Sequence, residues 1–172
     1  MGKLKVLFKI LVTIMAFFCF SGFKGRVVKV ADGDTVTVIQ DKTNKKVRIR
    51  FYGIDAPEKS QEYGKKSLSV LKNLLDNEIV EVEVRDKDQY GRIVGVVYHN
   101  NRNVNLYMLE TGNVWYYRQY AKGQYDYANA EKRAKENRIG LWKDKNPTPP
   151  WQYRREQRKI IKNLFIFKDY ML

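Results

Sequence analysis

Cysteine and histidine are almost missing from this sequence of 172 residues: Cys19 and His99 are the sole examples of each. A single thiol excludes an internal disulfide framework, so the fold must be held by its hydrophobic core. A zinc site of the usual composition is hard to assemble without more cysteine or histidine. Chemistry by paired histidines is excluded as well, and residues 98–101 are typical of an exposed turn without a chemical role.

Acidic residues are scarce relative to basic ones. The chain has 33 lysines and arginines against 19 aspartates and glutamates, a formal net charge of +14. Such an excess favours a polyanionic partner, either nucleic acid or an anionic membrane surface. Charge alone does not choose between these partners, and a basic protein that is merely soluble is the third interpretation.

Long apolar runs are limited to one, residues 10–20, which follow Lys3, Lys5 and Lys9. The run is short for a membrane span, which needs about 20 residues. A basic start, an apolar run and the small pair Ser21-Gly22 predict a signal peptide over residues 1–22 and a secreted or periplasmic protein. Its removal would leave a charge of about +11. Because bulky Phe20 adjoins the small pair, an uncleaved membrane anchor through residues 10–20 is the alternative.

Hydrophobic periodicity predicts five strands and three helices in the rest of the chain. The strands are expected at 26–30, 35–39, 47–51, 79–84 and 93–98, and the helices at 61–77, 105–111 and 121–137. Five short strands with a helix after the third predict an α+β fold, a five-stranded OB-fold β-barrel with about three packed helices. The length suits one domain, placed at residues 23–143.

Proline is also rare, and three of the four prolines lie in the C-terminal tail, residues 144–172. The passage 146–151 is therefore predicted to be extended. Residues 152–162 follow and are rich in arginine and lysine, with the pairs Arg154-Arg155 and Arg158-Lys159. These pairs are candidates for contact with nucleic acid or anionic lipid, and a solvated helix face is the simpler interpretation.

Three short segments carry the residues that could take part in a reaction. They are Asp32-Gly33-Asp34-Thr35, Arg50-Phe51-Tyr52-Gly53-Ile54-Asp55-Ala56-Pro57-Glu58 and Asp88-Gln89-Tyr90-Gly91-Arg92. Each segment adjoins a predicted strand, so the three are expected to converge on one cleft. Together they supply oxygen ligands for a hard cation, a carboxylate base and two guanidinium groups, which are what phosphodiester cleavage requires.

The residue types suggest a role for each member of the set. Asp34 and Asp55 are candidate ligands of Ca²⁺, which prefers several oxygen donors in a flexible arrangement. Arg50 and Arg92 are candidate phosphate clamps, and Glu58 is a candidate base for a water near the cation. Each also has an ordinary interpretation, since Asp-Gly is a common hairpin turn and charged side chains are usually solvated.

Taken together, these segments resemble the staphylococcal nuclease family over about residues 25–142. The matching pieces are residues 30–35, 50–58 and 90–92, with Gly140-Leu141-Trp142 similar to the end of the last helix of the family. Residues 149–155 are similar to a tail found in bacterial members. The resemblance implies an OB-fold barrel and Ca²⁺-dependent hydrolysis of DNA and RNA, with attack by water and release of the 5′ oxygen to leave 3′-phosphates.

The resemblance also implies roles for particular residues. It assigns the calcium ligands to Asp34, Asp55 and the backbone carbonyl of Ala56, and catalysis to Arg50, Glu58 and Arg92. Tyr90, Tyr117 and Tyr120 are weaker candidates for nucleic-acid contact, and the tyrosine pair of the family has no clean match here. Aromatic faces stack on bases with little sequence preference, although packing beside the barrel would also explain the last two tyrosines. Two departures are a shorter loop after Glu58 and Arg118 in place of a tyrosine.

The expected partner is DNA or RNA, bound by a monomer of low sequence specificity. A nucleic-acid-binding OB-fold module that does not cut is the alternative. Retention of all five carboxylate and arginine positions argues against that alternative.

Overall fold

The computed structural model describes residues 22–170, with side chains up to residue 163. The predicted signal peptide or anchor, residues 1–22, lies outside the described residues except for Gly22, which begins the first strand. Within residues 22–170, no helix is both long enough and apolar enough to cross a membrane.

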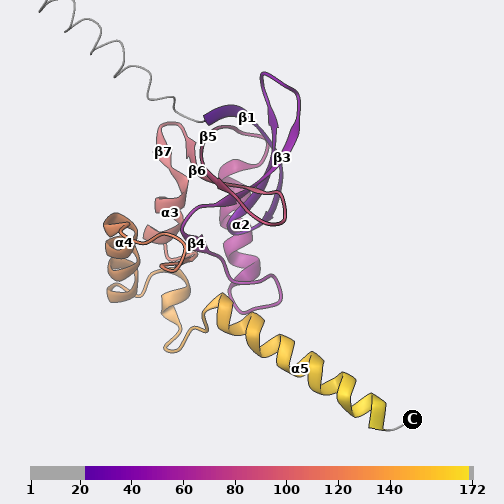
Figure 1. Ribbon diagram of the computed structural model, residues 1–172. Coiled ribbons are helices and arrows are strands. Elements are labelled where there is room, and N and C mark those ends of the chain that lie inside the picture. Colours follow the sequence, from indigo (N-terminus) through magenta and orange to yellow (C-terminus); the bar gives the residue numbers. More distant parts are fainter. Residues whose placement is uncertain (1–21, 171–172) are drawn as a thin grey trace, which may run out of the picture.

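A closed barrel of five strands forms the body of the molecule (Figure 1). The strands are β1 (Gly22–Asp32), β2 (Thr35–Gln40), β3 (Lys46–Phe51), β5 (Ile79–Lys87) and β6 (Ile93–His99). They pair in the order β3-β2-β1-β5-β6, and a parallel pairing of β3 with β6 closes the barrel. Three short strands complete the sheets: β7 (Arg102–Asn103) pairs antiparallel with the end of β6, and β4 (Ile54–Asp55) pairs with β8 (Trp115–Tyr116). The predicted OB-fold is confirmed.

The core of the barrel follows from the alternation of side chains along the strands. Val36 and Val38 of β2 and Ile49 and Phe51 of β3 point inward and are almost fully buried. Arg50 lies between the last two and points to the outer side, where its head remains partly accessible. The same alternation that fills the core therefore presents an arginine on the outside of β3.

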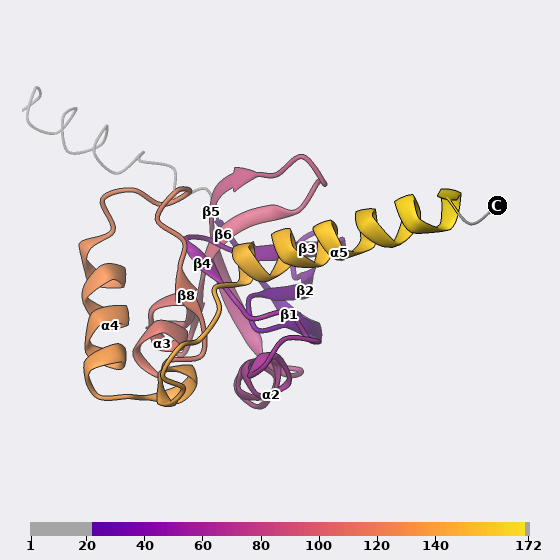
Figure 2. The same ribbon diagram turned by 90° about the horizontal axis from the view of Figure 1, so that it is seen from below.

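Helices cover the barrel on two sides (Figures 1 and 2). The three predicted helices are α2 (Gly64–Leu75), α3 (Val104–Glu110) and α4 (Tyr125–Glu136), followed by the 3₁₀ turn η1 (Gly140–Lys143). Leu71 and Leu75 of α2 are buried and close one part of the core.

A further helix, α5 (Pro150–Tyr170), starts beside the body and projects outward in both views (Figures 1 and 2). The prediction of an extended passage over 146–151 is correct only as far as Pro149. Proline suits the first position of a helix, where its missing N–H and its fixed φ cost nothing, so Pro150 begins α5.

Candidate active site

The first carboxylate of the site lies in the turn between β1 and β2. The backbone N–H of Asp34 donates to Asp32 Oδ1 over 3.1 Å, which closes the turn. The Asp34 side chain is buried, and it accepts hydrogen bonds from the Thr35 hydroxyl at 3.0 Å and from the backbone N–H of Ala56. The turn thus holds a buried carboxylate against the loop that follows β3.

Gly33 is needed in this turn for space. A Cβ at this position would lie 2.0 Å from Ser67 Oγ on α2 and 2.9 Å from the Cβ of Ala56. Its φ is not positive, so the glycine does not serve a left-handed turn here. The Asp-Gly-Asp sequence lets α2 pack directly against the turn that carries Asp34.

Arg50 joins the carboxylates of Asp34 and Asp55, which come from different segments of the chain. From β3 it forms ion pairs with Asp34 and with Asp55 Oδ1, the latter at 2.5 Å. Asp55 is fully buried and lies in β4, paired with Trp115 of β8. The structure therefore brings Asp34, Asp55 and Arg50 together, as the spacing of the motifs predicts.

Glu58 begins the loop after Pro57, close to these groups. Its backbone N–H donates to Gln61 Oε1 at 3.1 Å, and its backbone carbonyl accepts from the Gln61 N–H at 2.8 Å. The side chain of Glu58 is 41% exposed, so its carboxylate meets both the site and solvent. This placement suits a group that exchanges protons with water.

Arg154, near the start of α5, completes the cluster. The sequence offers it as a candidate for nucleic-acid or lipid contact, but its place beside Asp55 and Glu58 was not predicted. Its Nη2 lies 2.8 Å from Asp55 Oδ2, and its Nη1 lies 2.8 Å from Glu58 Oε1 and 3.3 Å from Asp55 Oδ1. Burial acts to lower the pKa of Arg154, but the hydrogen bonds with Asp55 and Glu58 outweigh it and raise that pKa above its ordinary value. Arg154 therefore remains charged and links Asp55 to Glu58.

Arg92 lies apart from this network. The register of β3 with β6 begins at Ile49 and Ile93, so Arg92 sits one position before the paired segment. Its Nε donates to Asp88 Oδ2 at 2.6 Å, and its backbone N–H donates to Asp88 Oδ1. Within the described part of the chain, no hydrogen bond or ion pair joins Arg92 to Asp55 or Glu58.

Comparison with known proteins identifies the family of this chain. The model of the family described as staphylococcal nuclease homologue matches residues 48–144. The chain belongs to the staphylococcal nuclease family. A Shigella flexneri protein named micrococcal nuclease is 33% identical over 171 residues, which cover 92% of this chain and 95% of that protein.

Two further relatives show how widely the nuclease-family domain is shared. A Haemophilus influenzae protein described as an uncharacterized endonuclease is 43% identical over 133 residues, 77% of this chain and 74% of its own length. The Arabidopsis thaliana staphylococcal-like nuclease CAN1 is 40% identical over 114 residues, 66% of this chain and 35% of that protein.

The candidate tyrosines of this nuclease-family site differ in their surroundings. Tyr90 is 76% exposed, and the guanidinium carbon of Arg92 lies 5.7 Å from its ring centre. Tyr117 and Tyr120 contact each other with ring centres 4.7 Å apart, and burial raises the pKa of Tyr117. Trp151 of α5 stacks on Tyr117 with the rings 5.3 Å apart and almost parallel. One face of Tyr117 is thus already covered by an aromatic ring.

The donor set of the site fits a hard cation such as Ca²⁺. Asp34 and Asp55 offer carboxylate oxygens that a single guanidinium already bridges, and the Ala56 peptide lies against Asp34. Among residues 22–170, no three side chains of His, Cys, Asp or Glu gather as a ready-made metal cluster. A cation here would therefore use two carboxylates, with backbone oxygen and water completing its coordination.

Proposed function

We propose that this chain is a Ca²⁺-dependent nuclease that hydrolyses phosphodiester bonds of DNA and RNA with low sequence specificity. The observation that carries the proposal is the meeting of buried Asp34 and Asp55 on Arg50, with Glu58 linked to Asp55 through Arg154. Membership of the family and the nuclease names of its relatives support the reaction class.

Each charged side chain has a task in such a reaction. Ca²⁺, when held by Asp34, Asp55 and the Ala56 carbonyl, would offset negative charge on the phosphate and help to orient the attacking water. Glu58 takes a proton from that water, and the water oxygen forms the new bond to phosphorus. Arg50 and Arg92 donate to the phosphoryl oxygens as charge builds on them. The bond to the 5′ oxygen breaks, solvent protonates that oxygen, and the other product keeps a 3′-phosphate.

The surface beside Glu58 also supports a nucleic-acid substrate. An open groove of about 510 Å³ adjoins Glu58, and its charged lining includes Lys29, Arg48 and Lys59. Basic side chains along a groove attract a phosphate backbone without reading bases. The net charge of +14 acts in the same direction.

The first test is cleavage of an end-labelled single-stranded oligonucleotide by the purified chain, in Ca²⁺ or in excess chelator. We expect cleavage only with Ca²⁺ and products that carry 3′-phosphates. Glu58→Gln should lower kcat by about 10²–10⁴-fold, because general-base catalysis contributes about that much. Product ends are identified by phosphatase treatment followed by gel electrophoresis.

Glu62→Gln is the matched control, since Glu62 is an exposed acid of the same loop. It should leave kcat within about twofold of the unchanged chain, as is usual for surface substitutions. Binding of the oligonucleotide without cleavage at any calcium concentration would refute the nuclease and leave a non-catalytic binding module.

We further propose that the nuclease is exported through its N-terminal segment and acts as a monomer. The basic and apolar composition of residues 1–22 supports export. N-terminal sequencing of the protein from the cell envelope and the medium would distinguish a cleaved signal peptide from a retained anchor.

A further inference from the structure

The C-terminal segment is fixed to the body by contacts that do not involve the charge of Arg154. We name residues 147–154 the tail strap. Trp151 stacks on Tyr117 and meets the ring of Trp115 edge-on at 5.7 Å. Tyr153 donates from its hydroxyl to Ser60 Oγ over 3.1 Å. The first turn of α5 is therefore held by aromatic packing and by a hydrogen bond to the Glu58 loop.

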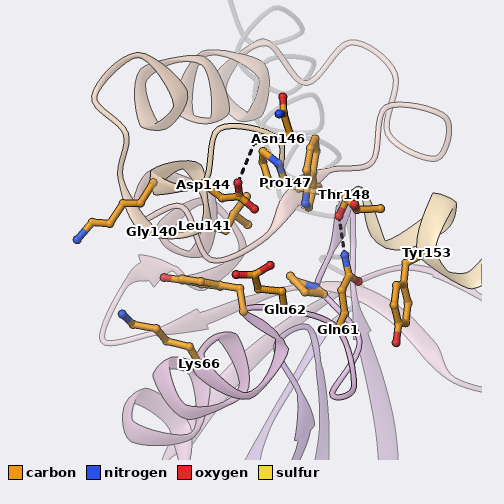
Figure 3. A pocket seen from close by; sticks show the side chains of 14 residues that line it. Gln61, Glu62, Lys66, Gly140, Leu141, Asp144, Asn146, Pro147, Thr148 and Tyr153 are labelled. Atoms are coloured by element: carbon orange, nitrogen blue, oxygen red, sulfur yellow. Dashed lines mark hydrogen bonds between the residues drawn. The ribbon is translucent and has the colours of Figure 1, made fainter.

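A cavity of about 610 Å³ lies between α2 and the tail strap, and residues that line it also hold the strap against the body (Figure 3). Gln61 reaches across from the loop before α2, and its Nε2 donates to the Thr148 carbonyl. Gln61 also holds the backbone of Glu58 through its Oε1. One side chain thus connects the strap to the candidate base, so the strap is a built part of the site and not a loosely attached tail.

The charges of the site make a second guanidinium useful. Asp34, Asp55 and Glu58 carry three negative charges, and Arg50 of the barrel neutralises part of them. A phosphodiester adds another negative charge, and more charge gathers on its oxygens in the transition state. Arg154 supplies a fixed positive charge within hydrogen-bond distance of both Asp55 and Glu58.

The exposure of Arg154 leaves room for a ligand. Its side chain is 36% exposed, whereas that of Arg50 is 19% exposed and that of Asp55 is fully buried. An arginine fork has five donors, and the three contacts to Asp55 and Glu58 use only two of its nitrogens. The Arg154 guanidinium is therefore partly open to solvent beside the Glu58 carboxylate.

We propose that Arg154 is a further catalytic arginine, which donates to a non-bridging oxygen of the scissile phosphate. This proposal rests on the proposed nuclease function. The tail strap delivers the guanidinium from outside the barrel, so the active site includes a part of the chain about 100 residues away from the carboxylates it touches.

The first measurement compares the full chain with Arg154→Ala, Arg154→Lys and Arg155→Ala. Arg155 is the exposed neighbour on the same helix, so its loss changes the net charge equally. On an oligothymidylate with Ca²⁺, we expect Arg154→Ala to lower kcat by about 10²–10³-fold, as the loss of one transition-state donor does. Arg154→Lys should recover part of that loss, because lysine keeps the charge without the fork. Arg155→Ala should stay within about twofold.

The second measurement needs no turnover. Fluorescence anisotropy in excess chelator compares a short oligothymidylate that has one phosphodiester among methylphosphonate linkages with one that has methylphosphonates only. The unchanged chain and Arg155→Ala should bind the charged oligomer about 3–10-fold more tightly, the loss expected for a charge-assisted hydrogen bond. Arg154→Ala should show a smaller preference for the charged oligomer than either of these chains, because one of the donors to the phosphodiester is gone while Arg50 and Arg92 remain.

The outcomes separate this proposal from the nuclease itself. Faster or unchanged cleavage by Arg154→Ala, or unchanged preference for the charged oligomer, would overturn the role of Arg154 and leave an inhibitory or purely structural arm. Absence of cleavage by the unchanged chain would instead refute the nuclease, while the binding comparison would still report whether Arg154 meets phosphate. Thermal unfolding within a few degrees of the unchanged chain shows that each variant is folded.

Discussion

Asp55 is held by two arginines that come from regions of very different construction. Arg50 lies in a strand of the closed barrel, between the buried side chains of Ile49 and Phe51. Arg154 lies on a helix whose residues 155–163 are exposed, and a few aromatic contacts fix its first turn. A side chain can therefore be held within hydrogen-bond distance of its partner either by a hydrophobic core or by a short strap. We expect the two arginines to differ greatly in how much their removal lowers the free energy of unfolding.

Removal of Arg50 is expected to have the largest effect on stability. Arg50→Ala would leave buried Asp34 without its cationic partner, and breaking a buried pair in this way costs about 3–5 kcal/mol. Arg154→Ala leaves Asp55 paired with Arg50, so we expect a loss of only about 1 kcal/mol. Urea denaturation in excess chelator measures both free energies of unfolding. Equal losses for the two variants would show that the strap and the barrel contribute alike.

Gly33 tests the barrel side of the comparison. Gly33→Ala would place a methyl group 2.0 Å from Ser67 Oγ, so either the Ser67 side chain must rotate or α2 must shift, and we expect about 1–3 kcal/mol of destabilisation. Ser67→Ala alone should cost little, because the buried Ser67 hydroxyl has no hydrogen-bond partner among residues 22–170. The double variant should recover part of the loss, as measured by thermal unfolding. Strict additivity of the two changes would contradict the proposed close contact.

Trp151 tests the strap side. Trp151→Ala removes the stacking on Tyr117 and the edge contact with Trp115, which together contribute about 1–2 kcal/mol. We expect the barrel to stay folded while trypsin cuts faster after Lys143 and Lys145, and kcat to fall as far as in Arg154→Ala.

Tyr125→Ala is the control for this aromatic deletion, since Tyr125 is 81% exposed. Its trypsin pattern and its kcat should match those of the unchanged chain. An undisturbed strap in Trp151→Ala, with slow proteolysis and full activity, would show that Gln61 and Tyr153 suffice to dock it.

Much of the barrel side could be predicted from the sequence because its signals are local. Side chains alternate along β3, so Ile49 and Phe51 face the core while Arg50 faces outward. The motifs with Asp34 and Asp55 lie next to predicted strands. Their meeting on Arg50 follows from that pattern. The chemical roles assigned to these residues remain predictions. The two-residue strands β4, β7 and β8 were not predicted, since periodicity cannot be read from so short a segment.

The contacts between the tail strap and the site could not be predicted from the sequence, for a physical reason. Arg154 meets Asp55 and Glu58 across separations of 99 and 96 residues, and a basic residue on a helix looks the same whether it is solvated or paired. The usable signal stood just before it. Trp151 follows two prolines, so a large apolar side chain lies in the first turn of a helix with a fixed start. A segment that is only solvated has no need of such a side chain, so this pattern indicates packing against the body.

Arg92 is held in a third way, by a surface turn. We expect changes to this turn to have the smallest effect on stability. Burial acts to raise the pKa of Asp88, but hydrogen bonds from the Arg92 side chain and from the turn backbone outweigh it and lower that pKa. A carboxylate with a lowered folded-state pKa contributes stability above its unfolded pKa of about 3.9 and loses it as the pH falls through the folded value.

Asp88→Asn keeps an oxygen for the backbone N–H groups of Tyr90 and Arg92 but removes the charge. It should therefore cost less than about 1 kcal/mol at pH 7, as for other surface pairs. This difference from the unchanged chain should shrink as the pH falls below the unfolded pKa of about 3.9 and vanish below the lowered folded-state pKa, because Asp88 is then protonated in the unchanged chain too. Urea denaturation at pH 7 and across the acid range measures it. A difference that stays constant down to the lowest pH would mean that the Asp88 charge does not stabilise the turn, and that Arg92, unlike Arg50 and Arg154, is positioned by the backbone alone.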